Sequence, residues 1–127
     1  MKKLALVLLL LPMSIATIAQ TLKITSVETT DPNKYQEMAE AHLGKTVTLK
    51  IYDNAITFTE QGMPVLYLKK VRDDEYLYSS TEDNSEKTML IDIHYTVGVI
   101  TSMDIQATTK NKYDGYTNTV TAVAKRF

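Results

Sequence analysis

The stretch that runs from residue 47 to residue 58 is VTLKIYDNAITF, in which large apolar side chains alternate with polar ones on both sides of an Asp-Asn pair. Alternation of this kind is typical of strands that are buried on one face. A two-residue turn at the Asp-Asn pair, whose residue types tolerate positive φ, pairs Ile51 with Ile56. Leu49 then lies opposite Phe58, and the large apolar side chains of the segment share one face. We therefore predict a β-hairpin here.

A second hairpin is predicted where VLYLKKVR (65–72) and EYLYSS (75–80) flank an Asp-Asp pair. Simple alternation across this turn places Tyr67, Tyr76 and Tyr78 on one face, whereas three leucines lie on the other. Both faces are partly apolar, so we expect other parts of the protein to cover each of them over part of its length.

A third hairpin is predicted within residues 91–105, IDIHYTVGVITSMDI. A three-residue loop at 96–98 pairs residue 93 with residue 101, with a glycine that can adopt positive φ. Burial favours this odd-length loop, because it places most of the apolar side chains on one face. The residues of that face are Met89, Ile91, Ile93, Tyr95, Val99, Met103 and Ile105.

Ahead of these hairpins we predict one strand and one helix. Residues 22–28 alternate loosely and are typical of a strand. Asp31 can cap a helix that starts at the following proline, and Gly44 can end it, so a helix is expected over residues 32–43. Its apolar positions recur at helical spacing. They are Tyr35, Met38, Ala39, His42 and Leu43.

A last strand is predicted over residues 116–125, which brings the total to about eight short strands in sequence order. Tight connections of this kind favour a mainly-β fold, an antiparallel up-and-down meander that forms a small barrel or a strongly bent sheet. The alternative is an α+β, cystatin-like fold in which the sheet wraps the helix. The apolar helix face and the two-sided second hairpin favour that alternative.

The hairpins VTLKIYDNAITF and IDIHYTVGVITSMDI, within about residues 45–126, make the chain similar to small secreted lipocalin-like (calycin-type) β-barrel proteins. This resemblance implies a barrel with a ligand pocket.

The first 19 residues differ in composition from the rest of the chain. Two lysines precede an eight-residue apolar run, and small residues follow it. This order is typical of a secretory signal peptide, whereas a membrane-spanning helix needs about 20 apolar residues. We expect residues 1–19 to be removed by cleavage before Gln20, with cleavage after Ala16 as the alternative. Residues 20–127 would then form one β-rich domain, exported to the periplasm or the extracellular space.

Composition excludes several classes of protein. The 14 basic and 15 acidic residues give a net charge of -1, which argues against a nucleic-acid partner. The chain has no cysteine, so disulfides, thiol catalysis and cysteine-based zinc sites are excluded. The residues that alternate back from Phe127 are too polar to face lipid, so we expect no membrane insertion. Nucleotide-binding and hydrolase motifs are absent, so we predict a protein without cofactor or catalytic activity.

The two histidines are the main candidates for acid–base chemistry. We interpret His42 as a partly buried side chain with one satisfied nitrogen in preference to a general base. His94 shares a strand face with Asp92, and in the predicted register with Ser102 and Asp104. Such a set could bind a metal or transfer protons, but the polar face of a hairpin carries solvated residues of these types anyway. We therefore assign no catalytic or metal site.

The predicted stripe of Tyr67, Tyr76 and Tyr78 is the most favourable binding feature of the sequence. Tyrosine is rigid and amphipathic, and it is common on surfaces that bind other molecules. The sequence thus indicates an exported, soluble binding domain whose ligand is a small hydrophobic molecule or a sugar. The alternative is a module that interacts with, or inhibits, another exported protein.

Overall fold

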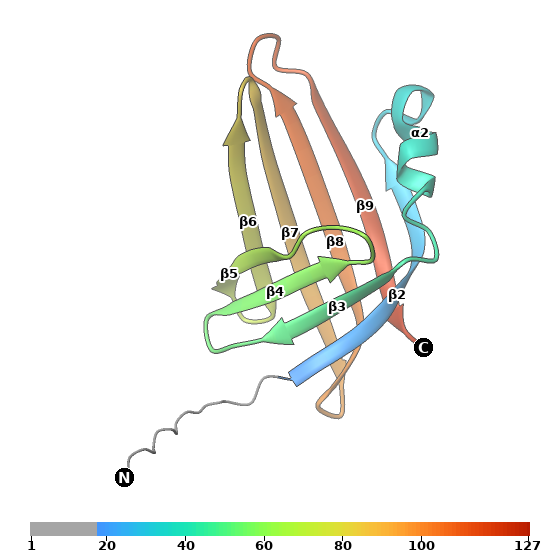
Figure 1. The fold of residues 1–127 in the computed structure, drawn as a ribbon, viewed down its shortest axis with the longest axis vertical. Coiled ribbons are helices and arrows are strands. Elements are labelled where there is room, and N and C mark those ends of the chain that lie inside the picture. The colour runs from blue at the N-terminus through green and yellow to red at the C-terminus, as the bar shows by residue number, and fades with distance from the viewer. Residues whose placement is uncertain (1–17) are drawn as a thin grey trace.

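The computed structural model describes residues 18–127, which form a closed barrel of antiparallel strands, each paired with its neighbours along the chain (Figure 1). The first strand, β2, also pairs with the last, β9, and this closes the barrel. The strands are β2 (Ile18–Thr29), β3 (Thr46–Ile51), β4 (Ala55–Glu60), β5 (Leu66–Arg72), β6 (Glu75–Glu82), β7 (Ser85–Thr96), β8 (Val99–Asn111) and β9 (Thr117–Arg126). The mainly-β barrel prediction is confirmed, and the cystatin-like alternative is wrong because the sheet closes on itself.

Most of the segment expected to be a signal peptide lies outside the described residues, and Ile18 and Ala19 belong to β2. Within residues 18–127, no helix has the length and apolar character needed to cross a bilayer.

The wall of the barrel is uneven because its strands differ in length. β7 and β8 have 12 and 13 residues, whereas β3 and β4 have six each. The long strands therefore extend beyond the short ones at one end, where the helix α2 (Pro32–Glu40) lies beside β2 (Figure 1). The barrel is filled where all strands face one another, and it is open where only the long strands continue.

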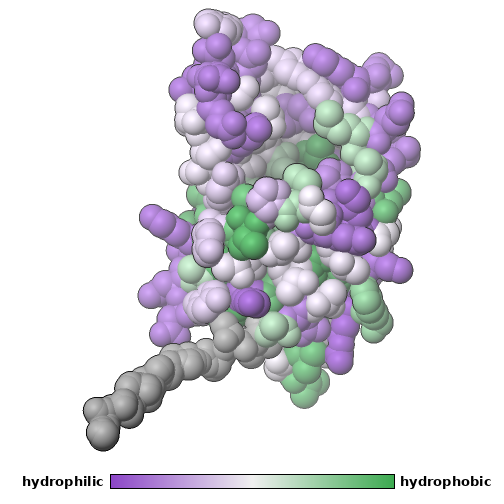
Figure 2. Space-filling view, viewed as in Figure 1, coloured by the Kyte–Doolittle hydropathy of each residue, from purple (hydrophilic) through white to green (hydrophobic). Residues whose placement is uncertain are grey.

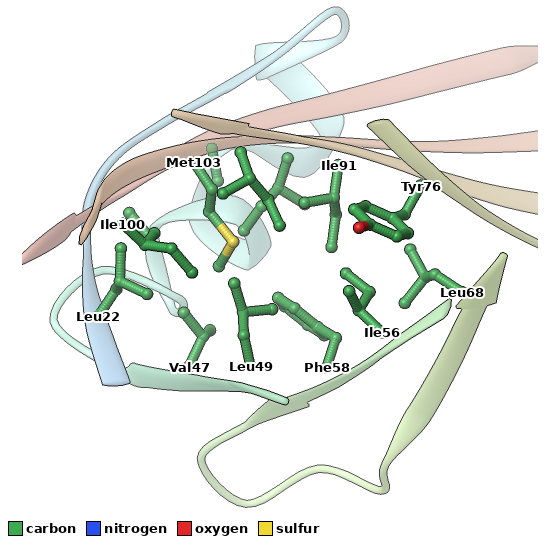
Figure 3. Close-up of a cluster of buried hydrophobic side chains, with 14 of the residues drawn as sticks. Leu22, Val47, Leu49, Ile56, Phe58, Leu68, Tyr76, Ile91, Ile100 and Met103 are labelled. Atoms are coloured by element: carbon green, nitrogen blue, oxygen red, sulfur yellow. The ribbon is translucent and has the colours of Figure 1, made fainter. Parts of the chain in front are cut away.

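The core consists of side chains that point inward from all eight strands (Figure 3). Alternation along each strand sends every second side chain to the interior, as expected for a barrel. The buried core residues are Leu22, Ile24, Val47, Leu49, Ile56, Phe58, Leu68, Tyr76, Ile91, Ile93, Ile100, Met103, Ile105, Ala122 and Ala124.

The first hairpin has the register that its sequence predicts. Ile51 pairs with Ile56 and Leu49 pairs with Phe58 across the β3–β4 turn. Three of these four side chains are buried and Ile51 packs against the core. Here the turn residues and the burial pattern favour the same register, and the prediction is confirmed.

The third hairpin has a different loop from the one predicted. Its turn has two residues, because Thr96 pairs with Val99, and the register then shifts so that Ile93 pairs with Met103. The shift is a β-bulge that leaves one extra residue, Thr101, on β8. Ile100 therefore points inward and is buried, and Val99, predicted to point inward, lies on the outer face opposite Thr96. Tyr95 keeps the predicted inward face, because it lies opposite Ile100, but it is at the end of the strand and is 40% exposed. The remaining predicted core residues of this hairpin do face the interior: Met89, Ile91, Ile93, Met103 and Ile105.

The second hairpin also contains a bulge that the sequence did not predict. Lys70 pairs with Tyr76 and Arg72 with Glu75, which leaves Val71 without a partner between them. This extra residue reverses the two faces of β5 relative to β6. Tyr67 consequently lies outside the barrel, while Tyr76 lies inside it.

The helix is shorter than predicted, because it ends at Glu40 and continues as turns to Gly44, whose φ is +81°. Asp31 precedes the helix but makes no side-chain cap, since its carboxylate accepts a hydrogen bond from the Tyr116 hydroxyl. Of the predicted apolar helix face, Ala39 is fully buried and Met38 is 63% exposed. The helix thus borders the open end of the barrel instead of packing into its core.

Candidate functional site

The open end of the barrel contains three adjoining cavities, which we call together the barrel-mouth cleft. The inner cavity, of about 130 Å³, and the side cavity, of about 160 Å³, share His42, Phe58, Glu60 and Met89 as lining residues. The outer cavity, of about 490 Å³, shares Met38, Ala107 and Val120 with the inner one. In the space-filling view, a recess with green, apolar atoms inside it opens above the short strands (Figure 2).

The inner cavity is lined mainly by apolar side chains that continue the barrel core. β2 contributes Ile24 and Val27, and β9 contributes Val120 and Ala122, while Ala39 of α2 closes one side. Alternation along β9 brings Val120 and Ala122 inward, and a β-bulge at Thr25 lets both Ile24 and Val27 of β2 face the interior. The walls of the inner cavity can therefore contact an apolar molecule.

The side cavity lies next to the connection between β4 and β5. This connection contributes Met63 and Pro64, and the adjacent Leu66 is partly buried against the core. Met63 is exposed, and methionine is a flexible side chain that adapts to the shape of a ligand. The side cavity thus extends the apolar surface toward solvent.

The outer cavity is more polar than the other two. Its walls include Thr109 and Asn111 of β8, Asn118 of β9 and, from the helix, Lys34 and Tyr35. Lining thus changes from apolar deep in the barrel to polar at its mouth, the arrangement that suits an amphipathic ligand.

A single pair of ionisable side chains lies between the inner and side cavities. Glu60 Oε2 is 2.5 Å from His42 Nδ1, and the Glu60 side chain is only 12% exposed. A buried carboxylate loses its hydrogen bonds to water, and the contact with the imidazole compensates for this loss. The predicted interpretation of His42, partly buried with one satisfied nitrogen, agrees with this contact.

The helix is held to the end of β9 by contacts around one tyrosine. The ring of Tyr116 lies 6.5 Å from that of Tyr35, and the ammonium of Lys34 lies over both rings. The hydrogen bond to Asp31 raises the pKa of Tyr116 to about 12. Behind this contact, the buried Asn118 amide oxygen accepts a hydrogen bond from a threonine hydroxyl of β2. These contacts position the helix along the outer cavity.

The three tyrosines of the predicted stripe do not lie together. Tyr76 is 4% exposed and belongs to the core, where its hydroxyl points into the apolar cluster (Figure 3). Burial raises the pKa of Tyr76. Tyr78 packs against the core, whereas Tyr67 is 72% exposed on the opposite face. The prediction of a shared tyrosine face is wrong, because the bulge in β5 reverses the faces of that strand.

Tyr67 lies instead in a separate groove on the outer wall. This groove of about 210 Å³, which we call the outer groove, also contains Tyr52 and Val65, both exposed. Threonines from β3 and β4 form its floor. The outer groove is therefore polar and aromatic, and it lies on the opposite side of the wall from the core.

The structure brings together the polar side chains of the third hairpin on the outer wall. Asp92 pairs with Asp104 across β7 and β8, and His94 Nε2 is 2.8 Å from Asp104 Oδ2. Burial and, secondarily, a hydrogen bond with the Glu75 carboxylate raise the pKa of Asp92. His94 and Asp104 are about half exposed, and within residues 18–127 no three such side chains are placed to hold a metal ion. Ser102 lies directly opposite His94.

Glu60 is a cleft residue that was not predicted from the sequence. It follows Ile56 and Phe58 at every second position of the same strand, so alternation alone places its carboxylate on the inward face. An acidic residue at an inward position is a signal for a buried polar contact.

The comparisons with known proteins add no assignment: no protein-family model, no curated protein and no solved structure matches this chain.

Proposed function

We propose that this protein binds a small, mainly apolar molecule in the barrel-mouth cleft and acts as a non-catalytic carrier or receptor for it. The observation that carries this proposal is the inner cavity, whose apolar walls continue the barrel core up to an open mouth. Pockets for small molecules in proteins are mostly apolar, with a few placed polar groups. The eight-strand barrel also supports, at the level of architecture, the proposal that the protein is lipocalin-like.

We propose further that the protein acts outside the cytoplasm, in the periplasm or the extracellular space. The composition of residues 1–19, with lysines, an apolar run and small residues in that order, supports export. Mass spectrometry of the exported protein should find an N-terminus at Gln20. Retention of Met1 in that fraction would contradict the proposal.

Binding in the cleft can be tested with a variant that fills it. Ala107 lines both the inner and the outer cavity, so Ala107→Trp should place an indole where the ligand lies. The neutral fluorescent probe N-phenyl-1-naphthylamine should bind the wild-type protein, with fluorescence that rises as it enters the apolar cavity. Ala107→Trp should weaken this binding by about tenfold or more, a loss of at least ~1.4 kcal/mol.

Gln106 provides the matched control, because it is the preceding residue of β8 and is exposed on the outer face. Gln106→Trp adds the same side chain to the same strand and should leave probe affinity unchanged. Equal probe affinities in the wild-type protein and in Ala107→Trp, with the fold intact by circular dichroism, would refute binding in the cleft.

A second candidate function is recognition of another exported protein through the outer groove. It is favoured by one observation, the exposure of Tyr67 beside Tyr52 and Val65, because tyrosine is enriched at protein interfaces. Tyr67→Ser should then abolish crosslinking to a specific exported partner without changing probe binding in the cleft. Identical crosslinking patterns for the wild-type protein and the variant would exclude the outer groove.

A further inference from the structure

The His42–Glu60 pair is the polar feature of the two apolar cavities. His42 lies in the turn that follows α2 and Glu60 lies at the end of β4, and both line the inner and the side cavity. An apolar molecule that occupies both cavities therefore lies beside this pair, together with Phe58 and Met89. Its chemistry decides which polar group such a molecule can bring.

Glu60 occupies one of the two imidazole nitrogens. Its carboxylate can only accept a hydrogen bond, so His42 Nδ1 carries the proton in this 2.5 Å contact. The remaining nitrogen, Nε2, is then an acceptor when the imidazole is neutral and a donor when it is protonated. A ligand hydroxyl fits both states, because it can donate to the first and accept from the second.

A ligand carboxylate fits this position poorly. Bound at Nε2, it would place a second negative charge close to the Glu60 carboxylate in largely apolar surroundings, where like charges repel strongly. No lysine or arginine is among the residues that line the inner and side cavities. Lys34 belongs to the outer cavity, and its ammonium lies over two tyrosine rings.

We propose that the His42–Glu60 pair makes the cleft selective for apolar molecules that carry a neutral hydroxyl group and against those that carry a carboxylate. This inference rests on the proposed function, because it concerns the molecules that the cleft binds. It assigns His42 the role of binding the hydroxyl and Glu60 the role of orienting the imidazole and repelling anions.

The test measures displacement of N-phenyl-1-naphthylamine by three ligands of equal chain length. These are 1-decanol, decanoate below its micelle concentration, and 1-methoxynonane, a methyl ether with the same number of heavy atoms as decanol but no hydroxyl hydrogen. In Glu60→Gln the repulsion is removed, so the ratio of decanoate to decanol dissociation constants should fall by about tenfold. In His42→Phe the preference for decanol over the ether should fall by about fivefold, the effect of one net hydrogen bond.

Matched controls come from other parts of the chain. Glu28→Gln removes the same charge from an exposed position of β2, and His94→Phe removes the other histidine from the outer wall. Neither should change either ratio. If His42→Phe fails to fold because Glu60 loses its partner, Glu60→Gln still tests the selectivity.

The outcomes separate this inference from the proposed function. No probe binding by the wild-type protein would overturn both. Probe binding that Ala107→Trp weakens, together with ligand ratios that Glu60→Gln leaves unchanged, would overturn the selectivity alone. Decanoate that binds the wild-type protein more tightly than decanol and loses its affinity in Lys34→Gln would also overturn it, by placing the head group in the outer cavity. The inference is supported if the ratio of decanoate to decanol dissociation constants falls in Glu60→Gln and the preference for decanol over the ether falls in His42→Phe.

Discussion

Replacement of Tyr76 with serine should greatly destabilise the barrel, because this side chain is 4% exposed and lies in the core. Removal of a buried aromatic ring costs about 3–5 kcal/mol, through lost apolar contact and the cavity that remains. A domain of this size has a total stability of about 5–15 kcal/mol, so the loss is a large part of it. Tyr67→Ser is the matched substitution: Tyr67 is 72% exposed, and the cost should be within about 0.5 kcal/mol.

Urea titration followed by far-ultraviolet circular dichroism measures both variants, since the chain has no tryptophan for fluorescence. The free energy of unfolding falls by roughly 2 kcal/mol per molar urea in a domain of this size. Tyr76→Ser should therefore lower the midpoint of urea unfolding by about 2 M, and Tyr67→Ser by about 0.25 M or less. Tyr78, which packs at the edge of the core, should give an intermediate shift as Tyr78→Ser. Equal midpoints for the Tyr76 and Tyr67 variants would refute the assignment of these rings to opposite faces of the wall.

Three further substitutions test local features. Val97 has a φ of +51°, which a β-branched residue adopts at a cost, so Val97→Asn should raise the free energy of unfolding by about 1 kcal/mol in urea titration; an unchanged midpoint would contradict this conformation. Burial and the Glu75 carboxylate raise the pKa of Asp92, so its charged form is disfavoured in the folded state. Asp92→Asn should therefore stabilise the protein at neutral pH, and this gain should vanish as the pH falls through the raised pKa; a gain that persists in acid would argue against this cause. The pKa of Tyr116 is about 12, above the ordinary tyrosine value. The hydrogen bond from its hydroxyl to Asp31 therefore stabilises the folded protein fully at pH values below the ordinary tyrosine pKa, and this stabilisation is lost as the pH rises toward 12. Asp31→Asn should lower that pKa in an absorbance titration of tyrosinate, and an unchanged titration would exclude Asp31 as its cause.

The parts of the fold that were predictable are those in which alternation and turn chemistry agree. In the β3–β4 hairpin both favour one register, and Leu49 and Phe58 lie opposite each other as predicted. Gly44 has the positive φ that suits glycine, but the helix ends earlier than predicted, at Glu40, and turns lead from there to the glycine.

The registers that could not be predicted depend on β-bulges. Thr101 and Val71 are each one extra residue in a strand, and neither has a side chain that distinguishes it from an ordinary strand residue. Beyond each bulge the inward position holds a fully buried side chain, Met103 on β8 and Leu68 on β5, so burial further along the strand favours the bulged register. When no bulge is assumed, alternation places the residues beyond the bulge on the wrong face of the sheet. Tyr67 is such a residue.

The candidate site was harder to predict, because it consists of residues that only the closed barrel brings together. His42 and Glu60 are 18 residues apart and come from a turn after the helix and from a strand. The helical spacing of apolar residues predicts that His42 lies on the inward side. The cleft above it exists because the strands differ in length, and no short stretch of sequence indicates that difference. The polar set of Asp92, His94 and Asp104 lies within one hairpin, and sequence reasoning did bring these residues together.

Closure of the barrel by β2 and β9 has a consequence for how the chain folds. Leu22 pairs with Arg126 and Thr29 pairs with Val120, so the seam joins segments from opposite ends of the sequence. The intervening hairpins can form as they are synthesised, but β2 has no β9 neighbour until nearly all of the chain is available. Contacts of such long range slow folding, and an unclosed sheet exposes two strand edges to other chains. We therefore expect the sheet to stay open during synthesis and to become a closed barrel only when β9 is available to pair with β2.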